Sequence, residues 1–215
     1  MPASHEPFTN LRLIDHPLIQ HKLSLARDRR TSSWEFRRLL NQITGLMTFE
    51  ILRTLPTKSI EVETPLERTG GKVVAKPVTF VPILRAGIAM TDGILALMPE
   101  ARVGHIGIYR EEDTLQPVTY YCKLPGDVAA GPVLLIDPML ATGGSACKAA
   151  AMLKERLCTD IRLICLVAAP EGLQRLAAEH PDVIVSAAAL DRQLNDKGYI
   201  LPGLGDAGDR IFGTQ

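Results

Sequence analysis

The sequence has few cysteines, no net charge and no long apolar run, and each of these absences argues against a class of protein. The four cysteines form no C-x-x-C pair and no ligand-like spacing with the histidines, which argues against structural zinc and against a disulfide framework. We expect them to be buried free thiols in a reducing compartment. The 24 basic and 24 acidic side chains balance, so the chain has no general electrostatic attraction to nucleic acid or to an anionic membrane.

No uninterrupted apolar stretch reaches the roughly 18 residues that a membrane-spanning helix needs, and the start MPASHEPFTN does not resemble a signal peptide. We therefore expect a soluble, cytoplasmic protein. No internal repeat, low-complexity tract or linker divides the 215 residues, which predicts one domain over 1–215. Within it, residues 1–31 are expected to form an N-terminal arm, loosely held over its first 15 residues.

Short apolar stretches alternate with helical ones along the chain, and this alternation predicts an α/β domain with a mostly parallel central sheet flanked by helices. A capping box, Ser32-x-x-Glu35, opens a long amphipathic helix that runs to about Leu55. The other helices are predicted at 88–98, 146–157 and 171–179. Strands are predicted at 78–84, 103–109, 118–124, 133–136, 161–168 and 183–187.

Two further features are predicted to project from this domain. Residues 60–64 and 72–78 alternate enough to form strands, which suggests a hairpin around Gly70-Gly71. The polar stretch from Glu111 to Pro117 precedes another strand and predicts a protruding hairpin or lid.

The most informative stretch is VLLIDPMLATGGS at 133–145. An apolar strand ends in Asp137, a small-residue turn follows, and a helix begins after it. Free backbone N–H groups and the positive end of the helix dipole converge in such a turn and favour an anion. Taken alone, the TGGS turn fits equally well a tight turn whose serine caps the helix. The strand that ends in Asp137 favours a phosphorylated ribose, and no Walker A pattern is present.

Two arginines are predicted to join this site. Ligands of an open parallel sheet bind beyond the carboxyl ends of its strands, where Arg85, Arg110 and Asp137 each follow a predicted strand. Two guanidinium groups and a phosphate turn suit a ligand with phosphate at one end and pyrophosphate at the other. Either arginine can instead be a surface ion-pair partner. The cluster Arg27, Arg29 and Arg30 is read as a solvated or interface surface, with a phosphate or effector patch as the alternative.

The C-terminal segment contains a misleading pattern. GLGDAG at 203–208 satisfies G-x-G-x-x-G, but a dinucleotide-binding fingerprint must open a βαβ unit, and only seven residues follow Gly208. We expect instead a tight loop whose backbone amides and Asp206 face a flat polar ligand. A merely flexible tail is the alternative, although Ile200 and Phe212 supply apolar anchors.

LLIDPMLATGGS resembles the phosphoribosyl-pyrophosphate (PRPP) motif of the phosphoribosyltransferases, in the version found in uracil phosphoribosyltransferases. Further similar stretches are HPLIQHKLSLARDRRT at 16–31, VPILRAGIAM at 81–90, IGIYREEDTLQPVTYY at 106–121 and GYILPGLGDAGDRIFGT at 198–214. The likeness covers nearly the whole chain. Most phosphoribosyltransferases carry a second acid where this chain has Pro138, as the uracil-specific branch does.

The resemblance implies a type I phosphoribosyltransferase fold in which residues 188–215 form a hood over the base. It implies transfer of the 5-phosphoribosyl group from PRPP to uracil, giving UMP and pyrophosphate, with Arg85, Arg110, Asp137 and Asp206 as catalytic residues. Uracil is expected at Ile200, Gly205, Asp206 and Ala207. PRPP is expected at Arg85, Arg110, Asp137, Pro138, Met139, Leu140, Ala141, Thr142, Gly143, Gly144, Ser145 and Asp206.

The resemblance also implies Mg²⁺, held mainly through PRPP with no direct protein ligand, a homodimer or larger homo-oligomer, and a possible GTP effector. No nucleic-acid or membrane partner is expected. Two alternatives stay open at this point. One is a phosphoribosyltransferase for another base. The other is an RNA-binding regulator built on the same fold, against which the neutral charge argues because RNA affinity depends on phosphate neutralisation.

Overall fold

The structure is a computed structural model, and it describes residues 8–111 and 117–214. The strands of its main sheet are β1 (Leu11–Leu13), β4 (Thr79–Leu84), β5 (Arg102–Val103), β6 (His105–Arg110), β7 (Pro117–Lys123), β8 (Val133–Ile136), β9 (Met139–Leu140), β10 (Ile161–Ala168) and β11 (Ile184–Leu190). The order across the sheet is β1-β11-β10-β8-β4-β6-β7, with β5 paired to β4 and β9 to β10. Every pairing is parallel except β6 with β7. The predicted mostly parallel sheet is confirmed.

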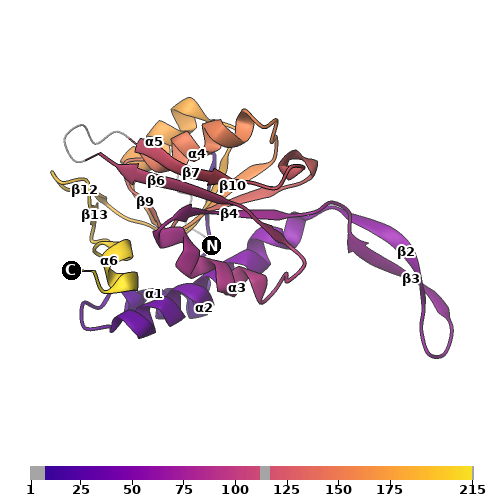
Figure 1. The fold of residues 1–215 in the computed structure, drawn as a ribbon. Helices are drawn as coiled ribbons and strands as arrows, with labels where there is room; N and C mark the ends of the chain where they lie inside the picture. Colours follow the sequence, from indigo (N-terminus) through magenta and orange to yellow (C-terminus); the bar gives the residue numbers. More distant parts are fainter. Residues whose placement is uncertain (1–7, 112–116, 215) are drawn as a thin grey trace.

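Helices cover both faces of this sheet (Figure 1). One face carries α1, α2 and α3, and the other carries α4 and α5. The α-helices are α1 (Pro17–Arg27), α2 (Ser33–Ile51), α3 (Thr91–Leu95), α4 (Gly144–Lys154), α5 (Pro170–Glu179) and α6 (Ala207–Phe212). Short 3-10 helices lie at η1 (Leu52–Thr54), η2 (Ala86–Met90) and η3 (Val128–Ala130).

The core therefore has two layers, and β8 shows how the sequence builds them. Leu134 and Ile136 belong to the cluster under α1 and α2, whereas Val133 and Leu135 belong to the cluster under α4 and α5. All four side chains are fully buried, and burying each stabilises the fold by roughly 1.5–3 kcal/mol relative to an exposed position. A strand buried on both faces holds the residue after it, Asp137, in a fixed place.

Several predicted elements differ from the observed ones. The stretch predicted as one helix at 88–98 is divided into η2 and the short α3. Ser32 is the N-cap of α2, but its side chain makes no capping hydrogen bond. Residues 8–15 are not loosely held, because β1 pairs with β11 and Ile14 donates its N–H to Ala187 O at 2.9 Å; residues 1–7 of the expected arm lie outside the described residues.

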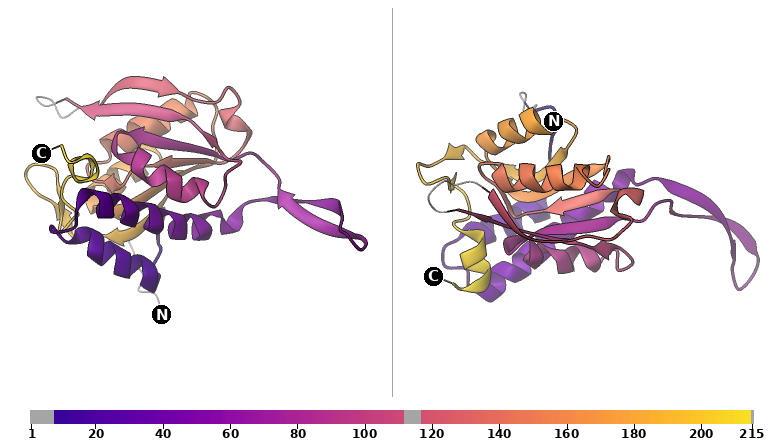
Figure 2. Two further views of the ribbon diagram at one scale, coloured as in Figure 1. Left: turned by 60° about the horizontal axis from the view of Figure 1, so that its bottom comes forward. Right: turned by 45° about the horizontal axis from the view of Figure 1, so that its top comes forward.

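A two-stranded arm, β2 (Thr57–Glu63) with β3 (Arg68–Val74), projects away from the body of the molecule in every view (Figures 1 and 2). The predicted hairpin exists, but the predicted turn at Gly70-Gly71 is wrong, since both glycines pair within β3. The chain turns at Thr64, whose Oγ1 accepts from the N–H groups of Leu66 and Glu67. Pro65, with its fixed φ, suits this turn.

A second hairpin lies at the sheet edge, where β6 pairs antiparallel with β7 and a bulge interrupts the register at Gly107. The lid predicted for 111–117 belongs to the connection of this hairpin, and its residues 112–116 lie outside the described residues. Within the residues that the structure describes, no helix has the length and apolar character that a bilayer crossing requires.

Candidate active site

The stretch between β8 and α4 forms one wall of a cleft. Asp137 follows β8 directly, the two-residue strand β9 pairs with β10, and α4 starts at Gly144. Asp137 donates its N–H to Ile164 O at 3.1 Å, which ties the turn to the sheet. The structure confirms the strand, turn and helix start predicted from the sequence, and the first N–H groups of α4, which have no partner within the helix, lie at this wall.

Gly143 is required by the backbone at this turn. Its φ is +79°, a left-handed conformation that side chains with a Cβ rarely adopt. A Cβ at this position would lie 2.9 Å from Gly172 O and 3.3 Å from Arg175 Cβ, so α5 closes the space behind the turn. The turn is therefore shaped by its own glycine and by the helix packed behind it.

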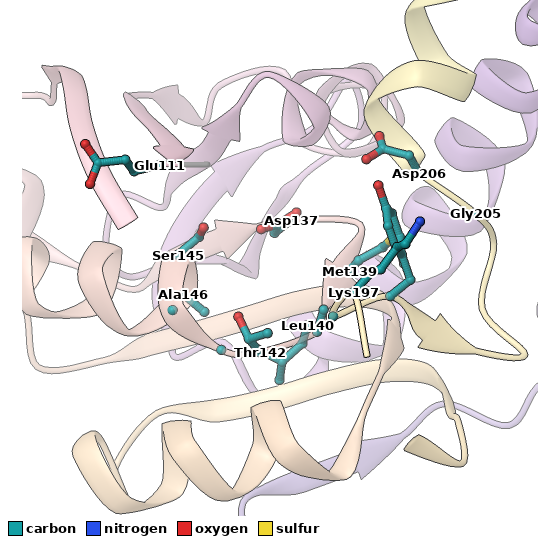
Figure 3. A pocket seen from close by; sticks show the side chains of 15 residues that line it. Glu111, Asp137, Met139, Leu140, Thr142, Ser145, Ala146, Lys197, Gly205 and Asp206 are labelled. Carbon is teal, nitrogen blue, oxygen red and sulfur yellow. The ribbon is translucent and has the colours of Figure 1, made fainter. Parts of the chain in front are cut away.

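The cleft has a volume of about 470 Å³, and Figure 3 shows the side chains around it. The second wall comes from the C-terminal segment, where β12 (Gln193–Leu194) pairs with β13 (Ile200–Leu201) and the loop at 205–206 follows. The cleft is lined by Glu111, Asp137, Met139, Leu140, Ala141, Thr142, Gly143, Gly144, Ser145, Ala146, Lys197, Gly198, Tyr199, Gly205 and Asp206.

A second cavity, of about 500 Å³, adjoins the first because both are lined by Asp137, Ser145 and Asp206. This cavity also contains Arg85, which is exposed and follows β4 directly. The Arg85 guanidinium carbon lies 5.8 Å from the centre of the Phe212 ring, a cation–π contact with the C-terminal helix α6. Arg85 and Asp137, two of the three residues predicted to meet at the carboxyl edge of the sheet, therefore line one cavity, and Asp206 of the C-terminal loop lines it with them.

Four other residues were predicted to bind a ligand, and their side chains are either buried or outside the described part of the chain. Arg110 is the last residue of β6, at the same edge, but its side chain lies outside the described part. Pro138 is buried, and its carbonyl accepts from Leu166 and Val167 of β10. Ile200 and Ala207 are 3% and 4% exposed and belong to the core, so only their backbone can meet a ligand.

Asp206 has a structural task of its own. Its carboxylate accepts a hydrogen bond from Asp209 N at 2.9 Å and so caps α6. The residue is nevertheless exposed and lines both cavities. The capped helix α6 shows that this segment is not merely a flexible tail, and Asp206 lies at both cavities.

The predicted arginine cluster is divided by the structure. Arg27 forms a two-pronged ion pair with Asp191, at 2.7 and 2.8 Å. Arg30 pairs with Asp28 at 2.7 Å on the surface, which lowers the pKa of Asp28 to about 2, chiefly through the side-chain hydrogen bond. Arg29 is exposed and, together with Arg27, lines a third cavity of about 520 Å³ that shares Gly205 and Asp206 with the cleft. Arg30 does not line this cavity, so the structure divides the cluster between a cavity and the surface.

The expectation of buried thiols is confirmed for three of the four cysteines, Cys122 being half-buried. Cys147 lies in the first turn of α4, close to the cleft. Burial, and then the charge of Glu179, raise the pKa of its thiol to about 11. Burial and the nearby Asp137 carboxylate likewise raise the pKa of Cys165. Both thiols are neutral at physiological pH and are unsuited to nucleophilic chemistry.

Sequence reasoning missed Lys197, Gly198 and Tyr199 in the lining of the cleft. They occupy the turn between β12 and β13, where the Asn195 side chain accepts from the N–H groups of Lys197 and Tyr199. The Asn-Asp-Lys-Gly pattern is typical of a turn. Its placement against the cleft depends on long-range packing, and no local pattern reveals that.

No group of three or more His, Cys, Asp or Glu side chains suited to a metal ion occurs in the described ranges. The carboxylates of Asp137, Asp206 and Glu111 do line the cleft. Such a donor set fits a hydrated divalent cation brought by a phosphorylated ligand, since Mg²⁺ keeps several waters and binds largely through substrate phosphates.

The fold and the site together define a class. The structure is similar to a hypoxanthine-guanine phosphoribosyltransferase from Bacillus anthracis, with a TM-score of 0.51, 8% identity, and coverage of 75% of this chain and 83% of that one. At this identity the likeness concerns the fold alone, and it confirms the predicted type I phosphoribosyltransferase fold.

The particular family follows from closer relatives. The model of the family "Uracil phosphoribosyltransferase" matches residues 13–214. The uracil phosphoribosyltransferase of Thermoanaerobacter sp. (strain X514) is 55% identical over 97% of this chain and 100% of that protein. That of Clostridium perfringens (strain 13 / Type A) is 56% identical over 94% and 97%. The structure of the AQ2163 protein from Aquifex aeolicus has a TM-score of 0.92, 36% identity, and coverage of 95% and 99%. The chain belongs to the uracil phosphoribosyltransferase family and is a transferase.

Proposed function

We propose that the two adjoining cavities bind PRPP and uracil, and that the chain transfers the 5-phosphoribosyl group to a ring nitrogen of uracil, giving UMP and pyrophosphate. The observation that carries this proposal is the shared lining. Asp137, Ser145 and Asp206 face both cavities, so one ligand can reach from the turn before α4 to Arg85. PRPP has this form, with phosphate at one end, pyrophosphate at the other and ribose between them.

In this arrangement the turn at 141–145 binds the 5′-phosphate through backbone N–H groups, helped by the hydroxyls of Thr142 and Ser145. Pro138, Met139 and Leu140 place that turn. Asp137 accepts hydrogen bonds from the ribose hydroxyls. Arg85 and Arg110 bind the pyrophosphate, to which guanidinium groups are well matched.

Uracil then lies against the hood. Because the side chains of Ile200 and Ala207 are buried, these residues and Gly205 offer backbone donors and acceptors to the edge of the base. Asp206 orients the base or accepts its ring proton. We also propose that residues 188–215 form this hood within a single domain that spans the chain.

In the reaction, the C1′–nitrogen bond forms as the bond from C1′ to pyrophosphate breaks, and uracil loses its ring proton. Positive charge develops on the ribose and negative charge on the leaving group. The residues of the cleft align the two substrates, and Arg85 and Arg110 stabilise the leaving charge. The cleft lined by Glu111, Asp137 and Asp206 would accommodate Mg²⁺ held mainly through PRPP, and such an ion would supply further neutralisation of the pyrophosphate charge.

The test is pyrophosphate release with PRPP, Mg²⁺ and a panel of free bases. Release with uracil alone, with UMP as the product, is the expected result. Release with another base would support the proposed site and show that it is specific for that base instead of uracil. A folded protein that binds PRPP but is silent with every base, and that shifts RNA at physiological salt, would instead be a regulator.

We further propose that the chain forms a homodimer or larger homo-oligomer in which the arm β2–β3 contacts a second copy. The arm is exposed along both strands, with only Gly71 half-buried. A two-stranded hairpin alone is at best marginally stable in water. The arm also exposes apolar side chains, namely Ile60, Val62, Leu66, Val73 and Val74.

Light scattering of the purified protein tests this proposal. We expect a mass of at least two chains, and a smaller mass when Leu66, which is 94% exposed, and Val62 are both changed to Asp. A matched change on the body, Leu157→Asp at a side chain 79% exposed, should leave the mass unchanged. A monomeric wild-type protein would contradict the proposal.

We also propose a GTP effector, which the resemblance implies, and a cytoplasmic location, which the composition of the chain suggests. A GTP effector is tested by adding GTP to the assay at sub-saturating PRPP, where a higher rate supports activation and an unchanged rate opposes it. The cytoplasmic location is tested by cell fractionation. In both cases the same assay of pyrophosphate release supplies the readout.

A further inference from the structure

A partly buried ion pair of Arg27 and Asp191 connects the hood to α1. Asp191 follows β11 and is 7% exposed, and Arg27 is the last residue of α1. Besides its two contacts with Arg27, at 2.7 and 2.8 Å, Asp191 accepts a hydrogen bond from Gly203 N at 2.9 Å. Arg27 in turn donates to Gly203 O at 2.8 Å. One ion pair therefore satisfies both backbone polar groups of one glycine.

That glycine stands at a sharp turn. Gly203 has a φ of +65°, and a Cβ there would lie 2.1 Å from Ile200 O. The turn connects β13 to the loop at 205–206, which lines the cleft. The residues next to Gly203 belong to no strand or helix. The contacts of Gly203 therefore set the direction in which the loop leaves this turn.

A second arginine fixes the next residue. Arg210 donates to Leu204 O at 2.8 Å, and also to Ala26 O at 2.6 Å and Asp28 O at 2.7 Å at the end of α1. Its guanidinium lies 4.1 Å from the centre of the Phe36 ring of α2. The two residues before Gly205 are thus tied, by side chains, to the junction of α1 and α2.

We propose that Arg27 and Asp191 are positioning residues for uracil: the pair sets the path of Gly203 and Leu204 and thereby aims the backbone of 205–207 at the base. The inference rests on the proposed placement of uracil at the hood. The ion pair does not touch the cleft, since neither residue lines either of its cavities. Arg27 lines a third cavity together with Gly205 and Asp206, and the contacts with Gly203 connect the pair to the loop at 205–206.

A merely structural ion pair and a positioning pair make different predictions. A structural pair affects the stability of the fold and leaves both substrates equally well bound. A positioning pair affects uracil selectively, because the turn that binds the 5′-phosphate belongs to β8 and α4 and has no contact with Gly203 among the hydrogen bonds of the described residues. The separation between the KM for uracil and the affinity for PRPP is therefore the decisive quantity.

The experiment compares Asp191→Asn, Arg27→Met and Arg27→Lys with the wild-type enzyme in the pyrophosphate-release assay, with PRPP affinity measured by isothermal titration. We expect Asp191→Asn and Arg27→Met to raise the KM for uracil roughly 10- to 100-fold, the order of loss that a displacement near 1 Å causes, while PRPP affinity changes little. Arg27→Lys keeps the charge without the two-pronged geometry and should give an intermediate KM.

The pair is also tested as a unit. The double variant Arg27→Met/Asp191→Asn should be about as impaired as either single variant, because the two residues hold the carbonyl and the N–H of Gly203 as one ion-paired unit. If a single variant does not fold, the double variant Arg27→Met/Asp191→Leu, which leaves no unpaired charge, replaces it. The control is Arg53→Met, which removes the exposed pair of Arg53 with Glu50 and should leave both substrates unaffected.

An unchanged KM for uracil in folded variants overturns the inference, and so does a loss of PRPP affinity equal to the loss for uracil. Asp206→Ala separates this failure from that of the underlying proposal. If Asp206→Ala raises the KM for uracil and the Asp191 and Arg27 variants do not, only the positioning role is wrong. If Asp206→Ala has no effect either, uracil does not lie at the hood.

Discussion

The two walls of the cleft are held in place by different means. The wall at 137–145 is one continuous stretch between a buried strand and a helix, and backbone hydrogen bonds to β10 fix it. The wall at 197–206 belongs to two-residue strands and glycine turns. It depends on side chains that reach across from α1 and from the end of β11.

If PRPP and uracil lie as proposed, this difference predicts that their binding is sensitive to different substitutions. A backbone-built wall is sensitive to changes in its own residues and tolerant of distant ones. A wall held by arginines is sensitive to residues that never meet the ligand. In a phosphoribosyltransferase arranged in this way, one wall binds PRPP and the other selects the base.

We expect the largest effect from Gly143→Val, which distorts the wall at 137–145. The left-handed φ of +79° and the approach of Gly172 O leave no room for a branched side chain. We expect kcat/KM for PRPP to fall about 100-fold or more, equivalent to about 2.7 kcal/mol of transition-state stabilisation. Gly126→Ala is the control, because a Cβ there meets nothing within 4 Å, and its kinetics should match the wild type.

Asp137→Asn tests the same wall without altering its shape. If the carboxylate binds the ribose hydroxyls, turnover should fall at least about tenfold, or about 1.4 kcal/mol in the barrier. Asp182→Asn is the control, since Asp182 pairs on the surface with Lys154 at the end of α4. Near-normal turnover of Asp137→Asn would remove Asp137 from the reaction.

A smaller effect is expected at the other wall, from Asp206→Asn compared with Asp206→Ala. Asn retains the cap of α6 and Ala loses it, so the pair of variants separates capping from contact with the base. We expect both to raise the KM for uracil roughly five- to tenfold, the value of one net hydrogen bond, with PRPP affinity retained. Full recovery in Asp206→Asn would mean that the residue only caps, and loss of PRPP binding with uracil binding intact would refute the hood assignment.

The smallest effect concerns Asp28, next to the carbonyl that accepts from Arg210. The Arg30 guanidinium beside Asp28 lowers the pKa of its carboxyl from the ordinary value of 3.8 to about 2, so its charge stabilises the fold above about pH 3.8, and this contribution is lost as the pH falls towards 2. The difference in Tm between wild type and Asp28→Asn should therefore be small at pH 7, as for exposed pairs generally, and should shrink below pH 4. A difference that grows on acidification would contradict this.

The two walls also differ in how far the sequence could predict them. The stretch around Asp137 and Gly143 is legible because its strand, turn and helix are adjacent in the chain. The sequence predicts that the hood is rich in turns. It does not predict that Lys197 lines the cleft, because partners more than 150 residues away determine where this segment lies. Residue resemblance, rather than periodicity, assigned uracil to it.

The arm shows the same limit on a smaller scale. Its strands were predicted, but its turn was placed at Gly70-Gly71, because a glycine pair is typical of a hairpin turn. The observed turn at Thr64 depends on a side-chain hydroxyl that bonds its own backbone. Residues 188–215 as a separate hood unit and residues 1–31 as an arm remain predictions.

The β2–β3 arm also affects the solubility of the protein. Both of its strands are sheet edges, and unpaired edges with apolar side chains can pair with other chains and start aggregation. Charged residues are placed along these edges, and Arg68 bonds Glu61 at 3.2 Å across the hairpin and lies 3.9 Å from Glu63. These charges disfavour uncontrolled strand addition. Changing Glu61 and Arg68 to valine would therefore make dilute, newly synthesised chains prone to precipitate.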